Sequence, residues 1–553
     1  MHIARQTGPE RRDTPHTGVN FAQGQLRKSL GQPPRPGGSF ARVPYTMNQL
    51  LKRVDFHNPR HLARLTLAFI ALHTIAWLLM AVVSQRAPHW DNIEELVWIQ
   101  SPDWGYSKHP PFSTWWIWAW AQVFGRNFWA TYLAGQINVA LMLIVVWRIA
   151  LVVVSPARAL VAVVFTAVIF YHSINGVVAD QNTVQLMPVA LLLWMVLLGV
   201  REGRWWQWVI AGIAAAACLL TKYSAVIWFA VMGVWVLLDA RMRTPRAWAG
   251  IALGIAVCLV LLIPHALWMV RENYPTWHYM NYQVGNETNH LNRLLRFVMS
   301  QASRVVPLIV TLLVVRWALR REPTVAAAAH APEFSEGRFV TMMALGPTLL
   351  ACALGTGLIS LHANWATTFY VMLGVWAVRW APRVDPAKLV RSVLTVGIAV
   401  DLLMVAGVSL SNGLLVDLIK RTSRSNFPAI ELGVAMDKVW DSRFASPLRV
   451  VIGETWIAGV TSVKSRHQPY VLQYGIPSES PWISPKLIDD CGALIVVDRR
   501  ETEKPPNDNV SAYLARATQK GTIDIPWNRF RPEPTLTVEW AIIEPRNPGA
   551  CTR

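Results

Sequence analysis

Charged residues are scarce in this chain, and apolar residues dominate it. Only 15% of its 553 residues are charged, whereas 53% are hydrophobic and 28 are tryptophan. A soluble protein of this composition would expose large apolar patches, while repeated apolar runs of about 20 residues are typical of transmembrane helices. The composition therefore indicates a polytopic membrane protein.

The sequence also lacks several motifs of soluble enzymes. It contains no CxxC pair, no HExxH sequence and no glycine-rich phosphate loop, which excludes the metal and nucleotide sites built on those motifs. We expect no cleavable signal peptide, because the first apolar run comes late and is long enough to span a membrane. Two of the five cysteines, Cys491 and Cys551, lie near the C-terminus. Outside the cytoplasm they would either form a disulfide or stay as separate thiols, and the sequence leaves both open.

The net charge of +19 suggests a nucleic-acid partner, but its distribution argues against one. Lys and Arg lie mainly in short loops between apolar runs, where they orient membrane helices. Their alternation predicts a cytoplasmic N-terminus and places loops 85–127, 172–182, 270–300 and 361–363 outside the cytoplasm. The predicted spans cover residues 65–84, 128–152, 158–174, 183–200, 205–220, 222–238, 247–269, 301–319, 339–360, 363–380 and 390–411.

These patterns predict three regions. Residues 1–60 are rich in Gly, Pro, Arg and Gln and are expected to be a disordered, basic, cytoplasmic segment; Met47 is an alternative start. Residues 61–412 form the membrane domain. An odd number of spans places the tail outside the cytoplasm, and its strand-length apolar runs at 448–452 and 493–497, after a helical pattern at 428–440, predict a small α/β domain over 425–553.

The first outside loop holds the densest group of ionisable residues. Asp91 lies a few residues beyond the first span, with Glu94 and Glu95 close behind. Burial at the lip of an apolar cavity would raise the pKa of Asp91 and suit it to accept a proton from a hydroxyl. The alternative, which spacing alone slightly favours, is a solvated acidic loop in which Asp91 caps a helix over 92–100.

Lys108 and His109 follow in the same loop, directly before Pro110-Pro111 and a tryptophan-rich helix. The prolines hold the two side chains rigidly at the membrane surface. A cation there either contacts the phosphate of a lipid-linked substrate or fixes the depth of the helix in the membrane, and the two roles are compatible.

Other unusual polar residues lie at the remaining outside turns. Asp180 precedes a span, either as a helix cap or as a second site carboxylate. Lys222 and Tyr223 lie at a tight turn, where the lysine either anchors the helix or contacts a phosphate. Arg271 opens loop 270–300, a candidate lid or acceptor-binding element. Their collection on one predicted face favours a functional site there.

At these residues the chain resembles glycosyltransferase family 39, polytopic enzymes of the GT-C fold that include protein mannosyltransferases and bacterial aminoarabinose transferases of lipid A. Residues 91–98 are similar to the family's Asp-Glu-Ala-Tyr-Tyr-Trp stretch, and 105–112 to its Gly-Tyr-x-x-His-Pro-Pro-Leu stretch. Residues 178–180, 220–223 and 364–366 match its Thr-Pro-Asp, Leu-x-Lys-Tyr and Asn-Trp-Pro motifs. The resemblance covers about 65–410.

Three positions depart from the family pattern. Asn92 replaces the usual Glu, so a two-acid motif is lost, and Ala366 replaces Pro. Lys108-His109-Pro110 replaces the Glu-Lys-Pro of the aminoarabinose transferases, which argues against that sugar.

The resemblance implies an all-α polytopic membrane protein of GT-C type, with about 11 transmembrane helices and a small C-terminal α/β extracytoplasmic domain. It further implies transfer of a sugar, with inversion, from a polyprenyl-phosphate carrier to a lipid A, lipopolysaccharide, glycan or protein acceptor at the outer face of a bacterial inner membrane. Asp91 would be the catalytic base, and Lys108, His109 and Lys222 would stabilise the departing phosphate. The expected substrate-binding residues also include Glu94, Glu95, Tyr106, Asp180, Tyr223 and Arg271. No metal or other cofactor is expected.

Two other functions remain as alternatives. A lipid or solute transporter fits the spans equally well, but it should place polar residues near the middle of the membrane and often shows internal repeats. A polymerase or ligase of pyrophosphate-linked glycans would also act from an outside loop, but it leaves Asp91 and His109-Pro110-Pro111 unexplained. The sequence names neither the sugar nor the acceptor.

Overall fold

A computed structural model describes residues 55–285, 290–325, 336–419, 421–499, 508–528, 530 and 533–551. All of them fall within one compact unit that spans 54–553. Most of the predicted disordered segment 1–60, including Met47, lies outside the described residues.

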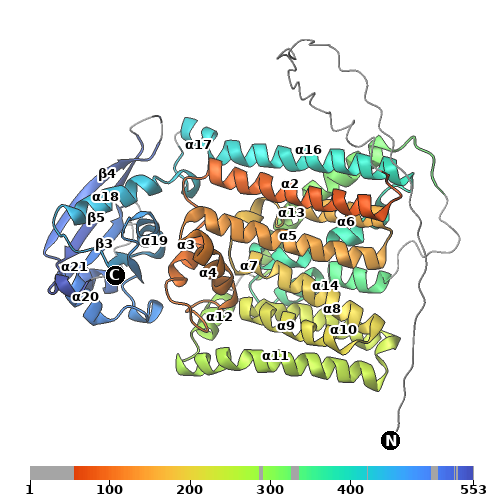
Figure 1. Cartoon of the computed structure of the whole chain (residues 1–553), viewed down its shortest axis with the longest axis horizontal. Coiled ribbons are helices and arrows are strands. Elements are labelled where there is room, and N and C mark those ends of the chain that lie inside the picture. The colour runs from red at the N-terminus through yellow and green to blue at the C-terminus, as the bar shows by residue number, and fades with distance from the viewer. Residues whose placement is uncertain are drawn as a thin grey trace, which may run out of the picture. The chain divides into compact units, whose positions relative to one another are not determined.

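The first part of this unit is a bundle of apolar helices (Figure 1). Seven of the described helical segments are long and apolar enough to cross a membrane: Pro59–Ser84 (α2), Phe128–Val153 (α5), Gln181–Glu202 (α7 and α8), Pro245–Arg271 (α11), His290–Ala318 (α13), Gly337–Gly355 (α14) and Pro386–Leu418 (α16 and α17). Shorter apolar helices are Pro156–Ala167 (α6), Trp205–Thr221 (α9) and Val226–Leu238 (α10). The chain is therefore a multi-pass membrane protein, while the number of eleven spans stays a prediction.

Three predicted segments differ from the structure. The helix expected over 158–174 ends at Ala167, and the chain then turns so that the Phe170 amide donates to the Arg304 carbonyl oxygen of α13 at 3.1 Å. The segment 363–380 is a series of 3-10 turns around a short helix, α15 (Leu373–Ala377). The loop expected over 270–300 contains helix α12 (Pro275–Gly285) and the start of α13. An apolar run indicates that a segment lies inside the membrane. It does not distinguish a straight helix from a turn whose backbone amides donate hydrogen bonds to a neighbouring segment.

A buried polar cluster joins the middle of α2 to the middle of α16. His73 Nδ1 lies 3.0 Å from Asp401 Oδ2, and the Trp77 indole donates to Asp401 Oδ1 at 2.8 Å. His73 Nε2 lies 3.0 Å from the carbonyl oxygen of His172. The cluster thus fixes both helices to the turn that follows α6, a connection that the sequence does not reveal.

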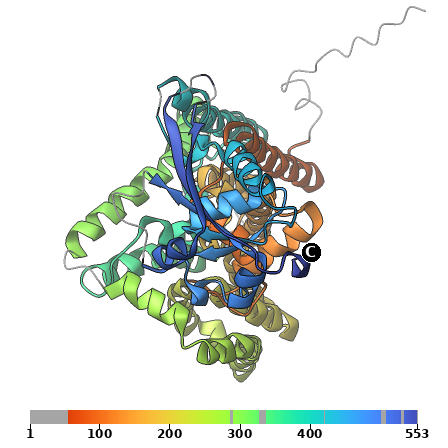
Figure 2. The same cartoon turned by 90° about the vertical axis from the view of Figure 1, so that its left-hand side faces the viewer.

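The C-terminal part is an α/β domain, as predicted. Its five strands are Val450–Gly453 (β1), Tyr470–Gln473 (β2), Ala493–Asp498 (β3), Gln519–Pro526 (β4) and Thr535–Ile543 (β5). They pair in the order β2-β1-β3-β5-β4. The pairs β1–β2 and β1–β3 are parallel, and β3–β5 and β4–β5 are antiparallel. The long strands β4 and β5 form the dark-blue ribbon of Figure 2. The α-helices of the C-terminal domain are Ala429–Asp441 (α18), Thr455–Lys464 (α19), Pro485–Cys491 (α20) and Asp508–Arg516 (α21).

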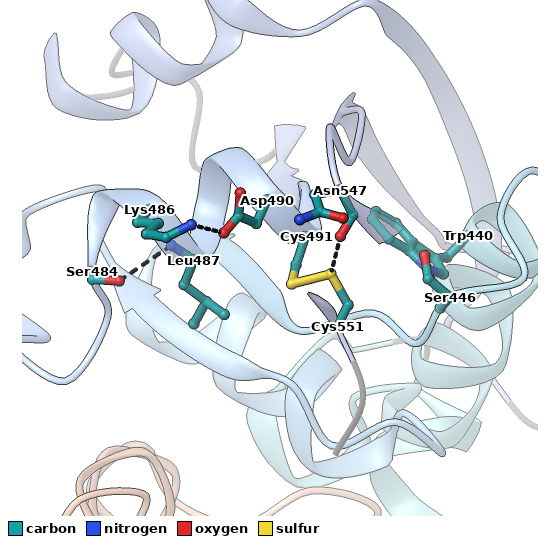
Figure 3. Close-up of a disulfide and its surroundings, with 9 residues drawn as sticks. All are labelled: Trp440, Ser446, Ser484, Lys486, Leu487, Asp490, Cys491, Asn547 and Cys551. Carbon is teal, nitrogen blue, oxygen red and sulfur yellow. Dashed lines mark hydrogen bonds and ion pairs between the residues drawn. A yellow bond between two sulfur atoms is a disulfide. The ribbon is translucent and has the colours of Figure 1, made fainter. Parts of the chain in front are cut away.

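Cys491 and Cys551 form a disulfide, which resolves the choice that the sequence left open (Figure 3). The bond joins the last residue of α20 to the end of the chain across 60 residues. The Cys551 sulfur lies 3.4 Å from the Asn547 carbonyl oxygen.

The C-terminal domain packs against the first outside loop through aromatic and charged contacts. Trp90 stacks on Trp456 of α19 with ring centroids 6.2 Å apart, and the Arg424 guanidinium lies 5.0 Å and 5.4 Å from the centroids of these rings. Arg86 pairs with Glu431 of α18 at 2.5 Å. These contacts hold the loop that carries Asp91 in one position.

Candidate active site

Asp91 lies in the first turn of helix α3 (Trp90–Trp98), which follows the first membrane helix. His89, not Asp91, is the N-cap, so the predicted capping role of Asp91 is wrong: the helix starts two residues earlier than expected. The Asp91 carboxylate is 29% exposed and lies 3.4 Å from His89 Nδ1. Almost all later residues of α3 are buried, so Asp91 is the acid of this helix that faces solvent.

Asn92, which departs from the family motif, connects helix α3 to neighbouring segments. Its side chain is fully buried and donates to the Thr131 hydroxyl at 2.8 Å and to the Val177 carbonyl oxygen at 3.2 Å. A buried polar side chain must be hydrogen-bonded to be tolerated. Asn92 therefore ties α3 to α5 and to the segment that leads to Asp180.

The charges around Asp91 set its protonation state. Burial by itself would raise the pKa of Asp91, but the hydrogen bond and charge of His89, together with the charge of Lys108, outweigh burial and hold this pKa below its usual value, so the predicted rise is wrong. Asp91 is thus an ionised carboxylate at neutral pH and can accept a proton, as a general base must.

Glu94 and Glu95 are buried beside Asp91 on the same helix. Glu94 accepts from the Lys108 ammonium at 2.5 Å, yet burial raises the pKa of Glu94 to about 7. Glu95 accepts from the Thr114 hydroxyl at 2.6 Å, and burial raises its pKa to about 8. Lys108 therefore has a local counter-ion, and Glu95 is largely protonated at neutral pH.

Asp180 and Lys222 are linked through Asn182. The Asn182 amide donates to Asp180 Oδ2 at 2.6 Å, and its oxygen accepts from Lys222 Nζ at 2.6 Å. Asp180 also caps the short helix α7 (Gln181–Val184) by accepting from the Thr183 amide at 2.8 Å. Burial and the neighbouring Asp91 charge raise the pKa of Asp180. Capping is thus confirmed for Asp180, and its electrostatic interaction with Asp91 places it in the same group.

His109 is uncharged in the folded protein. Burial, with Lys222 and Lys108 nearby, lowers its pKa to about 3. Its ring meets the rings of Tyr279 and Trp98 edge to face at centroid distances of 5.5 Å and 6.2 Å. The predicted role of His109 as a cation is therefore wrong, because a sequence does not reveal how deeply an imidazole is buried among cations.

The three remaining predicted residues make other contacts. Tyr106 and Arg271 line a cavity of about 260 Å³ whose lining does not include Asp91, and there Arg271 pairs with Glu272 at 2.7 Å and Asp103 at 3.9 Å. The Tyr223 hydroxyl lies 2.7 Å from His265 Nε2 and 2.9 Å from the Thr276 hydroxyl. Tyr223 thereby connects the turn after α9 to α11 and to the start of α12.

The structure also adds residues that sequence reasoning missed. His89 contacts Asp91, Asn182 bridges Asp180 and Lys222, and the Trp365 ring lies 5.7 Å from Lys222 Nζ. Two usable signals were the position of His89, two residues from Asp91, and the motif match over 364–366, which contains Trp365. Within the described parts of the chain, no group of three or more His, Cys, Asp or Glu residues has a metal-binding arrangement.

Known proteins are similar to this chain in sequence or in fold. A family model described as dolichyl-phosphate-mannose-protein mannosyltransferase matches residues 108–268. Lipid A galacturonosyltransferase RgtD from Rhizobium johnstonii is 24% identical over 308 residues, which cover 52% of this chain and 59% of that protein. ArnT from Cupriavidus metallidurans, crystallised with undecaprenyl phosphate, superposes with a TM-score of 0.55 at 15% identity, over 85% of this chain and 97% of ArnT. The apo form of ArnT gives a TM-score of 0.57 at 14% identity, with the same coverage.

The fold of this chain, a helical membrane domain followed by a small α/β domain, is shared with ArnT and confirms the predicted fold class. The chain spans 59% of the length of RgtD.

Proposed function

We propose that this protein is a GT-C glycosyltransferase that transfers a sugar from a polyprenyl-phosphate carrier to a lipid A or other envelope acceptor. The observation that carries the proposal is an ionised carboxylate, Asp91, within electrostatic reach of two lysines, Lys108 and Lys222, at the end of a membrane helix. The relatedness to a lipid A galacturonosyltransferase and the fold shared with a protein crystallised with undecaprenyl phosphate support these substrate classes.

In the proposed reaction Asp91 accepts the proton of the acceptor hydroxyl. The hydroxyl oxygen forms a bond to the anomeric carbon while the bond from that carbon to the carrier phosphate breaks, so the configuration inverts. The phosphate leaves with the electron pair, and Lys222 and Lys108 stabilise its charge. Fixed ammonium groups can supply this stabilisation, so we propose that the transfer needs no metal ion.

We further propose that the protein lies in a bacterial inner membrane with its C-terminal domain in the periplasm. The Cys491–Cys551 disulfide supports this placement, because disulfides persist in oxidising compartments such as the periplasm.

One observation, the buried pair His73 and Asp401, is compatible with the alternative function of a transporter. His73 and Asp401 are polar groups at the middle of membrane helices, where a transporter would place a substrate site. Both side chains, however, are satisfied by each other, by Trp77 and by the His172 carbonyl group. The cluster is thus sufficiently explained as a connection between helices.

Substitution of the base tests the proposal. Asp91→Asn keeps the size of the side chain but cannot accept a proton at neutral pH, so we expect a loss of transfer of at least ~100-fold with normal membrane insertion. The measurement is turnover of a defined polyprenyl-phosphate sugar by purified protein, with the exposed variant Glu272→Gln as the matched control. Near-wild-type turnover by Asp91→Asn would place the base elsewhere. Mass spectrometry of envelope glycolipids from a deletion strain would identify the sugar and the acceptor.

A further inference from the structure

A second, basic pocket lies where the first outside loop meets the C-terminal domain. It has a volume of about 580 Å³, and its lining shares no residue with the candidate active site. Arg126 of the loop and Arg449 and Arg466 of the domain contribute to its wall. Gln100 fixes the two parts here, donating to the Pro469 carbonyl oxygen at 2.8 Å and accepting from the Val471 amide at 3.1 Å.

Two of the three arginines have no ion pair among the residues that the structure describes. Arg466 pairs with Asp441 at 2.6 Å. Arg126 donates to neutral groups, the Leu96 and Ser462 carbonyl oxygens at 3.3 Å and the Ser462 hydroxyl at 2.7 Å. The Arg449 guanidinium lies 5.8 Å from the centroid of the Tyr470 ring and forms no ion pair with the residues that the structure describes. The pocket therefore has a net positive charge that suits an anion.

The charge of Arg126 persists in this partly enclosed position. Burial lowers its pKa to about 10, which still leaves the guanidinium protonated at neutral pH. Guanidinium groups bind phosphate through paired, charge-assisted hydrogen bonds. A phosphate group is therefore the anion that this arrangement fits best.

One wall of the pocket lies close to the end of a helix that can cross a membrane. Arg126 precedes by two residues the start of α5, a helix long and apolar enough to cross a membrane. Around it Trp118, Phe124 and Trp129 are 37%, 39% and 39% exposed. Exposed aromatic rings at a helix end are typical of the membrane–water interface. The phosphates of the bilayer are thus within reach of Arg126.

We propose that this pocket binds the phosphate of an anionic membrane lipid. Basic pockets at the ends of membrane helices recognise such headgroups. Occupation of the pocket would hold the C-terminal domain at the membrane surface, because its cations come from both the loop and the domain. The proposal does not depend on the transfer reaction.

The test compares lipid retention by full-length protein in detergent. Native mass spectrometry would measure binding of phosphatidylglycerol to wild type, Arg449→Gln, Arg449→Lys and Arg546→Gln. Arg546→Gln is the matched control, because it removes one exposed positive charge from the same domain outside the pocket. We expect Arg449→Gln to bind phosphatidylglycerol about 5- to 10-fold more weakly. Arg449→Lys should retain most of the binding, which would show that the loss is not caused by misfolding, and Arg546→Gln should match wild type.

A parallel experiment with inorganic phosphate distinguishes the source of the anion. Equal phosphatidylglycerol binding by wild type and Arg449→Gln, with no difference for inorganic phosphate, would overturn the pocket as an anion site. Equal phosphatidylglycerol binding with a loss of inorganic phosphate binding in Arg449→Gln would overturn the lipid and leave a soluble phosphate ligand.

Discussion

Lys108 and Lys222 differ in the neighbours that their ammonium groups meet. Lys108 is paired with Glu94 at 2.5 Å, whereas Lys222 Nζ donates to a neutral amide oxygen, that of Asn182, at 2.6 Å and lies 5.7 Å from the centroid of the Trp365 ring. A cation that already has a counter-ion offers less net charge to a phosphate. The two lysines should therefore contribute unequally to donor binding, which their positions in the sequence do not predict.

Alanine substitutions test this inequality. Lys222→Ala should raise the donor KM by roughly 10- to 150-fold, which is the range for loss of a charge-assisted contact. Lys108→Ala should raise the donor KM by roughly 10-fold or less, the low end of this range. Lys222→Arg should retain part of the donor binding, because the positive charge persists while its geometry changes. If both lysines only anchor helices at the interface, expression or stability would fall while the kinetics of each folded molecule would not change. In that case Arg293 and Arg296 would become the cations to test.

The buried acid Glu95 makes stability depend on pH. Burial raises its pKa from 4.5 to about 8, so between these values the folded protein holds a proton that the unfolded chain releases. The stability contributed by Glu95 is thus fully present below about pH 4.5 and is lost as the pH rises through about 8. Glu94, whose pKa is raised to about 7, acts in the same direction.

We expect the Tm of the protein in detergent to fall between pH 6 and pH 9, and Glu95→Gln to reduce that fall by on the order of 3 °C or more. Glutamine is the uncharged isostere of the protonated acid, so it keeps the native packing. The control Glu272→Gln alters an exposed acid and should follow the wild-type curve. An unchanged pH dependence in Glu95→Gln would mean that this carboxyl is ionised in the folded protein.

At the scale of elements, the disulfide holds α20 against the end of the chain. Cys491 is the last residue of α20, and Cys551 follows the turn Pro548–Ala550. The bond closes a loop that contains β3, β4 and β5. Closing a loop of this length restricts the unfolded chain and so stabilises the fold of the domain.

Replacement of both cysteines by serine should lower the stability of the C-terminal domain by about 2–4 kcal/mol. Denaturant unfolding followed through the tryptophans of the domain would measure this change, and reduced wild-type protein should behave like the double variant. The buried Cys218 lies outside the domain, so Cys218→Ser is the control. Equal stability of oxidised wild type and the double variant would contradict the bond.

On the scale of the whole molecule, the prediction to test is the membrane topology, that is, which segments lie on which side of the membrane. The alternation of basic loops predicts that residues 85–127 and 412–553 lie outside the cytoplasm and residues 1–64 inside. Reporter fusions after Gly125, Pro245 and Thr422 should report outside, inside and outside, respectively. A cytoplasmic signal at Gly125 or Thr422 would remove the candidate site from the compartment that the proposed reaction requires.

The sequence by itself determined the membrane character, the GT-C resemblance and the α/β tail. Each depends on composition, periodicity or motif spacing, which are local properties of the chain. The outside loop with Asp91, Glu94 and Lys108 could be found in the same way, because its residues are close in sequence.

Only the tertiary structure decided how those residues are paired and protonated. Contacts between distant segments leave His109 uncharged, bring Lys222 toward Asp91 and place Tyr106 and Arg271 in the wall of a cavity that Asp91 does not line. The basic pocket likewise joins Arg126 to Arg449, more than 300 positions along the chain. Protonation and pairing depend on burial and on charges a few ångströms away, and in a folded chain these are set by neighbours that sequence distance does not reveal.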